Sequence, residues 1–180
     1  MKTKLLFVLI LTFMILAQVG CAPSTASSDA CPTAAADTRL LTNTQDGYCL
    51  LYPVQDSAEL PGFIVINPFT GPGDIPGDAW VNIQVQDSAN RTAAQAADEA
   101  IAAAGQGFDI NRSEIQVDGS QAIVVDGLPG LDLNRVVYIV RNNRLYTLTF
   151  MPWQPGGMQS TPLEHLYDTI LQSIHFPAAE

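Results

Sequence analysis

Length, composition and charge already narrow the range of possible functions. The chain has 180 residues, 47% of them apolar, and it carries 18 acidic residues against 8 basic ones, a formal net charge of −10. Such a length suits a single domain. Both lysines, Lys2 and Lys4, lie before Cys21, so from Cys21 onward the 18 acidic residues face six arginines, a net charge of −12. The phosphates of a nucleic acid repel so acidic a chain, which excludes nucleic acid as a partner. Because no lysine follows Cys21, a polybasic membrane patch and a lysine-based phosphate loop are excluded as well.

Residues 1–20 are typical of a secretory signal peptide. Lys2 and Lys4 form a short positive region, and an apolar run of about 12 residues follows at positions 5–16. A helix needs roughly 20 apolar residues to cross the hydrocarbon core, so this run is a poor transmembrane anchor. We therefore interpret this segment as a removed signal and expect the protein to be exported.

The segment Ala17–Cys21 resembles the lipobox of bacterial lipoproteins, in which a cysteine after a small residue receives a diacylglycerol and becomes the new N-terminus. Gly20 and Cys21 match this pattern, whereas Gln18 stands where the motif usually has leucine. The resemblance implies a lipid-modified, palmitate-bearing Cys21 that anchors an extracytoplasmic protein to the membrane. The alternative is an ordinary signal cleaved nearby, which would leave a secreted soluble protein.

Residues 21–38 consist almost wholly of Ala, Ser, Thr, Pro and Asp, which cannot bury enough apolar surface to fold. We expect this segment to be a flexible tether between the anchor and a single domain at residues 39–177. Cys31 lies in the tether and Cys49 in the first predicted strand. Exported proteins keep disulfides, so one interpretation is a Cys31–Cys49 bridge. The other is a buried free Cys49 beside a dispensable Cys31.

The first half of the domain predicts three strands and one helix. Short apolar runs at 48–52 and 63–66 end at prolines, which cannot continue a ladder. Residues 81–86 alternate apolar and polar side chains, so we expect one buried and one exposed face in a strand there. The Ala-rich stretch 92–104 predicts a helix, with Asn90 or Thr92 as its N-cap and Gly105 as its C-cap.

The second half predicts an antiparallel meander and a closing helix. Strands are expected at 114–117 and 122–126 around an Asp-Gly turn, and at 134–141 and 144–151 around Asn142-Asn143, since Asp-Gly and Asn-Asn tolerate the positive φ of tight hairpins. A two-residue second turn would place Ile139 opposite Tyr146. Pro162 at a first helical position and apolar residues at helical spacing predict a final helix from 160 that docks on the sheet. The fold class is α+β, an antiparallel sheet of about six to seven strands with two main helices packed on it.

Four segments in this order resemble the PsbP-like group. They are Gly47–Pro53, Asp118–Ala122, Arg144–Phe150 and Ile170–Phe176, which correspond to a "Y…YP" strand, a "G…A" hairpin, a "Y.L.F" strand and an "IL.SF.F" helix exit. The resemblance implies a PsbP-like α/β sandwich and accessory or scaffolding roles, with no shared catalytic residues to transfer. The whole chain also resembles uncharacterised lipoproteins of filamentous Chloroflexi-type bacteria.

Residues that could support catalysis are sparse. The two histidines, His165 and His175, are ten residues apart, which is not a metal-binding spacing. We expect His165 to be a solvated helix residue and the His175 side chain to alternate out of the last apolar stretch. Ser160 near His165 lacks the GxSxG context of a hydrolase nucleophile. Asp118 and Asp126 flank a predicted hairpin and could lie near each other. We expect no cofactor, no metal site and no enzymatic activity, with a hydrolase or other enzyme that uses carboxylates or His165 as the alternative.

Three Gly/Pro-rich loops are the most unusual features, at 69–78, 126–132 and 152–158. Rigid loops that carry apolar side chains beside carboxylates suit recognition, so Phe69, Leu131, Asp132 and Trp153 are candidate binding residues. Strand order places Leu131 and Trp153 at one end of the sheet, where they would flank an exposed apolar patch. The alternative is that these are ordinary turns whose aromatic side chains fold back over the sheet. The resulting hypothesis is a non-catalytic binding or accessory module for an unidentified protein or small molecule.

Overall fold

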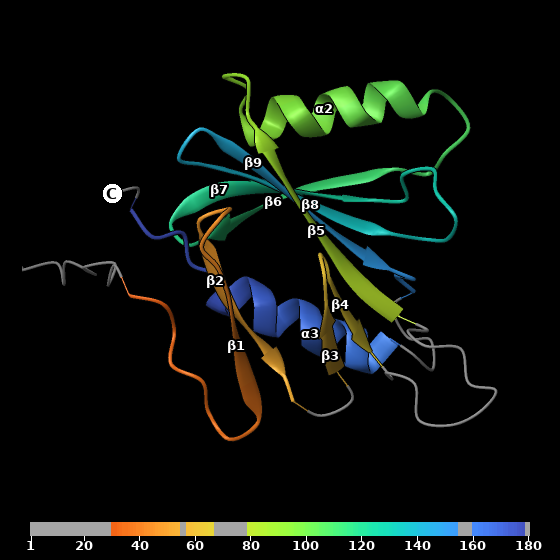
Figure 1. Cartoon of the computed structure of the whole chain (residues 1–180). Helices are drawn as coiled ribbons and strands as arrows, with labels where there is room; N and C mark the ends of the chain where they lie inside the picture. Colours follow the sequence, from red (N-terminus) through yellow and green to blue (C-terminus); the bar gives the residue numbers. More distant parts are fainter. Residues whose placement is uncertain (1–29, 55–56, 67–78, 155–159, 179–180) are drawn as a thin grey trace, which may run out of the picture.

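The computed structural model describes residues 30–54, 57–66, 79–154 and 160–178. Its main element is a seven-stranded antiparallel sheet in the order β3-β4-β5-β9-β8-β7-β6 (Figure 1). The strands of this sheet are β3 (Ser57–Leu60), β4 (Phe63–Ile66), β5 (Ala79–Asp87), β6 (Asn111–Val117), β7 (Ser120–Asp126), β8 (Arg135–Arg141) and β9 (Arg144–Met151). Among the described residues, no helix is both long and apolar enough to cross a membrane.

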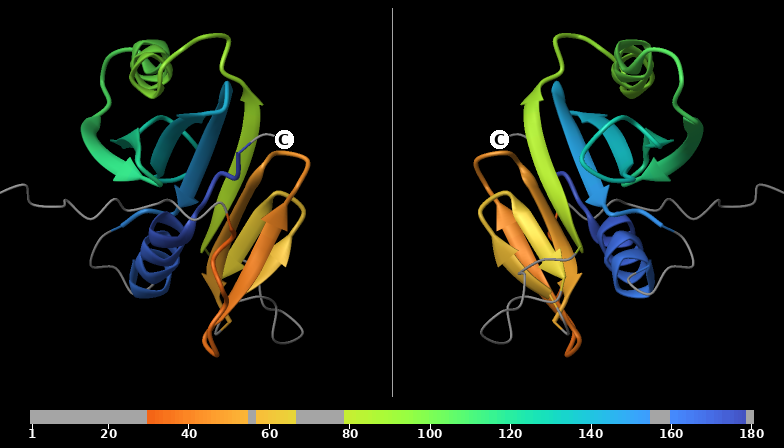
Figure 2. Two further views of the ribbon diagram at one scale, coloured as in Figure 1. Left: turned by 90° about the vertical axis from the view of Figure 1, so that its left-hand side faces the viewer. Right: turned by 90° about the vertical axis from the view of Figure 1, so that its right-hand side faces the viewer.

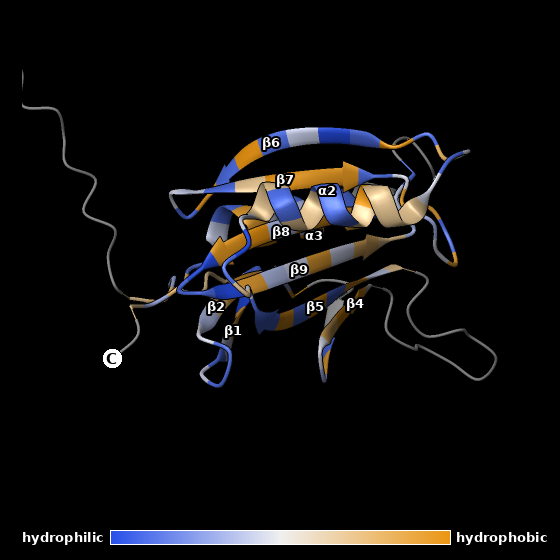
Figure 3. Ribbon diagram, turned by 90° about the horizontal axis from the view of Figure 1, so that it is seen from above, coloured by the Kyte–Doolittle hydropathy of each residue, from blue (hydrophilic) through white to orange (hydrophobic). Residues whose placement is uncertain are grey.

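A separate two-stranded hairpin and two helices cover the sheet. The hairpin consists of β1 (Thr38–Asn43) and β2 (Tyr48–Pro53) and lies on the same face of the sheet as α3 (Ser160–Ser173). The other face carries α2 (Ala93–Ala104), which contacts β7 and β8. Figure 2 shows these layers from the side, and Figure 3 shows α2 from above. The α+β fold class, the sheet and the two main helices predicted from the sequence are therefore confirmed.

The larger apolar core fills the space between the sheet, β2 and α3. Its fully buried members come from all three elements: Leu50, Ile64, Val81, Ala122, Val137, Ile139, Leu148, Phe150, Leu166 and Ile170. A smaller core lies under α2, where alanine side chains let the helix approach Ile123, Val125, Val136, Tyr138 and Leu145. Both faces of β7 and β8 are thus buried, which explains why these two strands are almost continuously apolar.

Local sequence signals correctly predicted most turns and caps. Thr92 is the N-cap of α2 and forms a capping box with Gln95, and Gly105 is its C-cap. Asn142 and Asn143 both have positive φ and connect β8 to β9, with Ile139 opposite Tyr146 as predicted. In β5 the predicted alternation is confirmed at four of six positions, since Val81 and Ile83 are buried and Gln84 and Gln86 are exposed. Asn82 and Val85 are half-buried.

The sequence analysis did not predict β1 and β3. In β1 two leucines are adjacent and so point to opposite faces, which breaks the alternation of apolar and polar residues, and none of the strand's six residues is buried. β3 has only four residues and forms an outer edge of the sheet. Neither strand carries the local pattern on which strand prediction depends.

Candidate functional site

The turn between β1 and β2 is held by its own side chains. The backbone N–H of Asp46 donates to Asn43 Oδ1 (2.9 Å), and Asn43 Nδ2 donates back to Asp46 Oδ2 (2.9 Å). Gly47 donates its N–H to the carbonyl of Asn43 (2.9 Å) and has a φ of +69°, a conformation that glycine adopts without strain. The turn is consequently a defined structure and not a loose connection.

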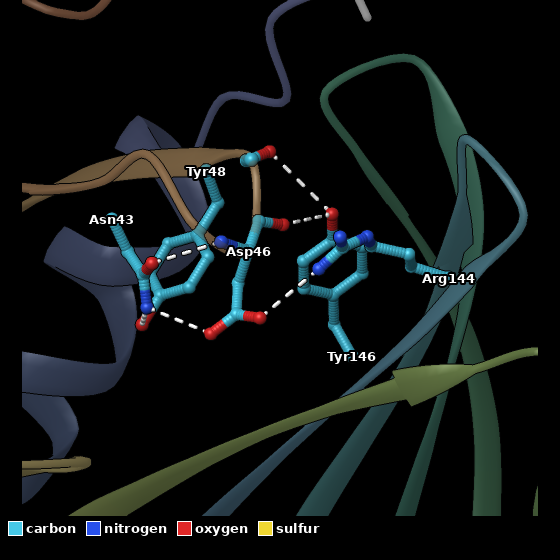
Figure 4. Close-up of polar contacts among 6 residues, drawn as sticks. Asn43, Asp46, Tyr48, Arg144 and Tyr146 are labelled. Carbon is cyan, nitrogen blue, oxygen red and sulfur yellow. Dashed lines mark hydrogen bonds and ion pairs between the residues drawn. The ribbon is translucent and has the colours of Figure 1, made fainter.

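Two residues of β9 fasten this turn to the sheet (Figure 4). Arg144 Nη1 donates to Asp46 Oδ1 at 3.0 Å, and the Tyr146 hydroxyl donates to the carbonyl oxygens of Asp46 (2.8 Å) and Gly47 (3.4 Å). Tyr146 is buried, and its ring contacts those of Tyr48 and Phe176. The hairpin turn therefore packs on a cluster of aromatic rings, and the Asp46–Arg144 ion pair lies beside it.

Burial sets the ionisation of the two tyrosines. It raises the pKa of Tyr48, with smaller contributions from a hydrogen bond to Asn43, which lowers it, and from the Asp46 charge. Burial also raises the pKa of Tyr146, and this outweighs the opposing effect of Arg144. Both phenols are therefore protonated at neutral pH, so Tyr146 acts as a hydrogen-bond donor and not as a base.

A cavity of about 540 Å³ opens beside the turn, and we call it the hairpin-turn cleft. It is lined by Cys31, Thr42, Asn43, Thr44, Gln45, Asp46, Gly47, Tyr48, Asn142, Arg144, Tyr146, Pro177 and Ala178. Thr42, Thr44 and Gln45 are exposed, and the Arg144 side chain is 43% exposed. Hydroxyl, amide and guanidinium groups beside tyrosine rings are suited to hydrogen-bonding a ligand.

A second cavity of about 410 Å³ lies beside the same turn. It shares residues 42–46 and Tyr48 with the hairpin-turn cleft and adds Glu59, the exposed Leu60 and the exposed Phe63 from the β3–β4 hairpin. The turn thus stands between two cavities, and its own side chains line both of them. Such an arrangement supports binding. It does not bring together a nucleophile, a base and a group to orient them.

The structure corrects one of the predicted recognition residues. Trp153 and the loop that carries Leu131 do share an end of the sheet, since the Trp153 N–H donates to the carbonyl of Leu133 (2.8 Å). Leu131 is 99% exposed and Asp132 is exposed, but Trp153 is only 7% exposed. The prediction of Trp153 as an exposed anchor was wrong, because its ring folds back over the end of the core.

Arg135 of the same domain stacks on the Trp153 ring. The Arg135 guanidinium carbon lies 4.0 Å from the centre of the Trp153 ring and 5.0 Å from that of Tyr167. Asp126 accepts hydrogen bonds from Arg135 Nε and Nη2, both at 2.8 Å, and this contact raises the pKa of Arg135. Glu164 and Asp168 complete the lining of a cavity of about 350 Å³ here. Cation–π stacking and a bidentate ion pair thus engage the Arg135 guanidinium within the domain.

The two carboxylates considered for acid–base chemistry do not meet. Asp118 precedes β7 and Asp126 ends it, so the seven-residue strand separates them. Asp118 Oδ1 contacts His175 Nδ1 at 3.1 Å, and Asp118 Oδ2 accepts from the Phe176 N–H at 3.0 Å. Each carboxylate therefore has its own basic partner. His175, expected to be an unremarkable residue turned out of the last apolar stretch, is instead buried, while His165 is exposed on α3.

The structure joins Cys31 and Cys49 in a disulfide with a Cα–Cα distance of 5.8 Å. Cys49 is fully buried, and its backbone pairs with that of His175 through bonds of 2.9 and 2.8 Å. Of the remaining predicted site residues, Cys21 and Phe69 lie outside the described residues. Within the described ranges, no three metal-binding side chains gather at a point that could hold a metal ion.

The residues that build the hairpin-turn cleft were not predicted as a site. Gly47, Tyr48 and Arg144 were noted only as parts of strand motifs, and Asn43 and Asp46 had no role. The Asp46–Arg144 ion pair joins residues 98 positions apart. Apart from the Asp-Gly pair at 46–47, which is typical of a turn, the sequence contains no local signal for this cluster.

This arrangement of sheet, hairpin and helices defines a PsbP-like fold. A solved neighbour is the solution structure of cyanobacterial PsbP from Synechocystis sp. PCC 6803, which aligns with a TM-score of 0.50 and 16% sequence identity over 82% of this chain and 97% of that chain. At this identity the likeness concerns the fold alone. No protein-family model matches the sequence, and no curated protein matches it.

Proposed function

We propose that the protein is a lipid-anchored, extracytoplasmic, non-catalytic binding or accessory module whose ligand binds in the hairpin-turn cleft. The observation that carries this proposal is the cleft itself, a cavity of about 540 Å³ around a turn fixed by the Asp46–Arg144 pair. It offers several exposed polar side chains and no assembled catalytic group. The lipobox-like segment at Gly20–Cys21 supports the anchor.

The net charge narrows the partner. With 18 acidic residues and six arginines from Cys21 onward, the domain is repelled by anionic lipid headgroups. The cleft itself combines hydroxyl and amide groups with one partly exposed guanidinium. We therefore infer a protein segment or a neutral polar molecule as the ligand, and not an anionic lipid surface.

The anchor is tested by Cys21→Ser. The variant lacks the thiol that would carry the lipid, so we expect the protein to move from the membrane fraction to the exported soluble fraction. Wild-type protein and a Ser24→Ala variant, which changes a neighbouring residue, serve as controls and should stay with the membrane. Unchanged partitioning of Cys21→Ser would refute lipid anchoring.

The cleft is tested by capture of components from the protein's own cell envelope. Thr44→Arg places a long charged side chain at the exposed rim of the cleft, and Ala103→Arg places the same side chain on the exposed surface of α2. We expect Thr44→Arg to lose a component that both the wild type and Ala103→Arg retain. Equal capture by both variants would remove the cleft from consideration.

A further inference from the structure

The described part of the N-terminal segment runs alongside the hairpin before it enters β1. Cys31 is bonded to Cys49, and Cys49 is opposite Thr42, one pair from the end of the β1–β2 ladder at the turn. Thr38, where β1 begins, is opposite Pro53 at the other end of the hairpin. Residues 31–37 therefore lead from near the hairpin turn to the far end, and β1 returns along the hairpin (Figures 1 and 2).

Hydrogen bonds hold only the far end of this segment. The Ala35 N–H donates to Thr38 Oγ1 (2.9 Å), and Val54 donates its N–H to the carbonyl of Asp37 (2.8 Å). Between residues 31 and 34, the described structure contains no backbone hydrogen bond to the hairpin, and the disulfide is the bond that attaches this stretch to it. Loss of this one bond would move the last attachment point of the chain from Cys49 to the Ala35–Asp37 region.

We propose that the Cys31–Cys49 disulfide determines which end of the domain faces the membrane, and that it brings the hairpin-turn cleft to the membrane side. The inference rests on the proposed lipid anchor at Cys21 and adds to it the location of the partner. Cys31 itself lines the cleft. The binding site is thus built at the point where the anchored chain reaches the domain, and its partner is held in or at the same membrane.

Chain length sets the distance. The ten residues from Cys21 to Cys31 span at most about 35 Å whatever their conformation, since an extended chain rises no more than roughly 3.5 Å per residue. Without the disulfide, the 14 residues from Cys21 to Ala35 could reach about 50 Å. The attachment point would also move four residues along the hairpin, on the order of 13 Å at the rise of a strand. The disulfide thus shortens the reach and selects the end of the domain that is drawn inward.

The test is energy transfer from labelled lipoprotein to the surface of phosphatidylcholine vesicles that contain an acceptor lipid. Gln45→Cys places a donor dye at the exposed hairpin turn, and Arg39→Cys places it near the opposite end of β1. Flotation with the vesicles is measured first. In protein with the disulfide intact, we expect more transfer from position 45 than from position 39.

The disulfide is then removed in a Cys31→Ala/Cys49→Ala background. We expect the order of the two transfer efficiencies to reverse, because the chain now leaves the domain beside residue 39. Chemical reduction of the labelled protein after dye coupling gives the same comparison if the double variant does not fold. Flotation with equal transfer from the two positions, or with an order that disulfide loss leaves unchanged, would overturn the inference alone. Failure of the protein to float would overturn the lipid anchor and, with it, the inference.

Discussion

Two clusters at opposite ends of β8 use the same residue types in different ways. At one end Arg135 pairs with Asp126 and stacks on Trp153, and at the other Arg144 pairs with Asp46 above Tyr146. The Arg135 side chain is 22% exposed and contacts its carboxylate through two bonds, whereas the Arg144 side chain is 43% exposed and uses one nitrogen. In the first cluster, the carboxylate and two aromatic rings engage the guanidinium. In the second cluster, the Arg144 side chain stays partly exposed beside the hairpin-turn cleft, so the degree of closure distinguishes a stabilising cluster from a candidate site.

The largest expected effect is in the closed cluster. Trp153→Ala should lower the free energy of unfolding by about 3 to 5 kcal/mol, because it empties an aromatic core site and exposes the face on which Arg135 stacks. Urea denaturation measures this change, and capture by the hairpin-turn cleft should persist. Leu131→Ala is the matched control at the same end of the sheet and should change stability by less than about 0.5 kcal/mol, since Leu131 is fully exposed. Similar losses for the two variants would contradict the assignment.

A smaller effect is expected under the open cluster. Tyr146→Phe keeps the buried ring and removes the hydroxyl that donates to Asp46, which should cost about 0.5 to 1.5 kcal/mol. Tyr138→Phe is the control, because Tyr138 is also buried but its hydroxyl donates no hydrogen bond within the described structure. If both substitutions prove equally costly in denaturation curves, the contact with the turn contributes nothing specific.

Arg144→Gln should affect stability little and ligand capture strongly. The Asp46–Arg144 pair is partly exposed, so its loss should cost no more than about 1 kcal/mol. The variant nevertheless removes the guanidinium from the cleft and frees Asp46. Arg91→Gln is the control, because it breaks a partly exposed pair with Glu99 of α2 and should cost a similar amount of stability. Undiminished capture by Arg144→Gln would show that the open cluster is not a binding site.

The smallest expected effect concerns the alkaline limit of stability. Burial raises the pKa of Tyr48 and Tyr146 above the ordinary value near 10, so the folded state retains phenolic protons that the unfolded chain releases. Their contribution is complete below about pH 10 and declines as the pH rises toward the folded-state pKa values. Tyr48→Phe should make this decline shallower in urea denaturation between pH 8 and 11. An unchanged slope would contradict the pKa assignment.

The sequence predicted those parts of the molecule that depend on neighbouring residues. The capped Ala-rich helix, the Asn142-Asn143 turn and the β8–β9 register all follow from patterns within about ten positions. The Asp118–His175 pair, the Asp46–Arg144 pair and the stacking of Arg135 on Trp153 join residues that are distant in the chain. Periodicity and turn propensity carry no information about such contacts, because they depend on how the layers pack.

For the loops, the sequence predicted their position in the fold but not the orientation of their side chains. Strand parity correctly placed Leu131 and Trp153 at one end of the sheet, because it is a property of chain direction. Whether an aromatic side chain points outward or inward depends on what lies beside it in the folded domain. For Trp153 that neighbour is Arg135, held by Asp126, and no pattern in the 152–158 segment specifies this partner.

The backbone pairing of Cys49 with His175 has a practical consequence for handling the protein. It brings the residues after α3 to the hairpin turn, and Pro177 and Ala178 form part of the wall of the cleft. An affinity tag or fluorescent fusion joined directly after Ala178 would therefore start at the candidate binding site and compete with its ligand. The exposed Gln106-Gly107 connection between α2 and β6, on the other face of the sheet, is the better place for an inserted epitope.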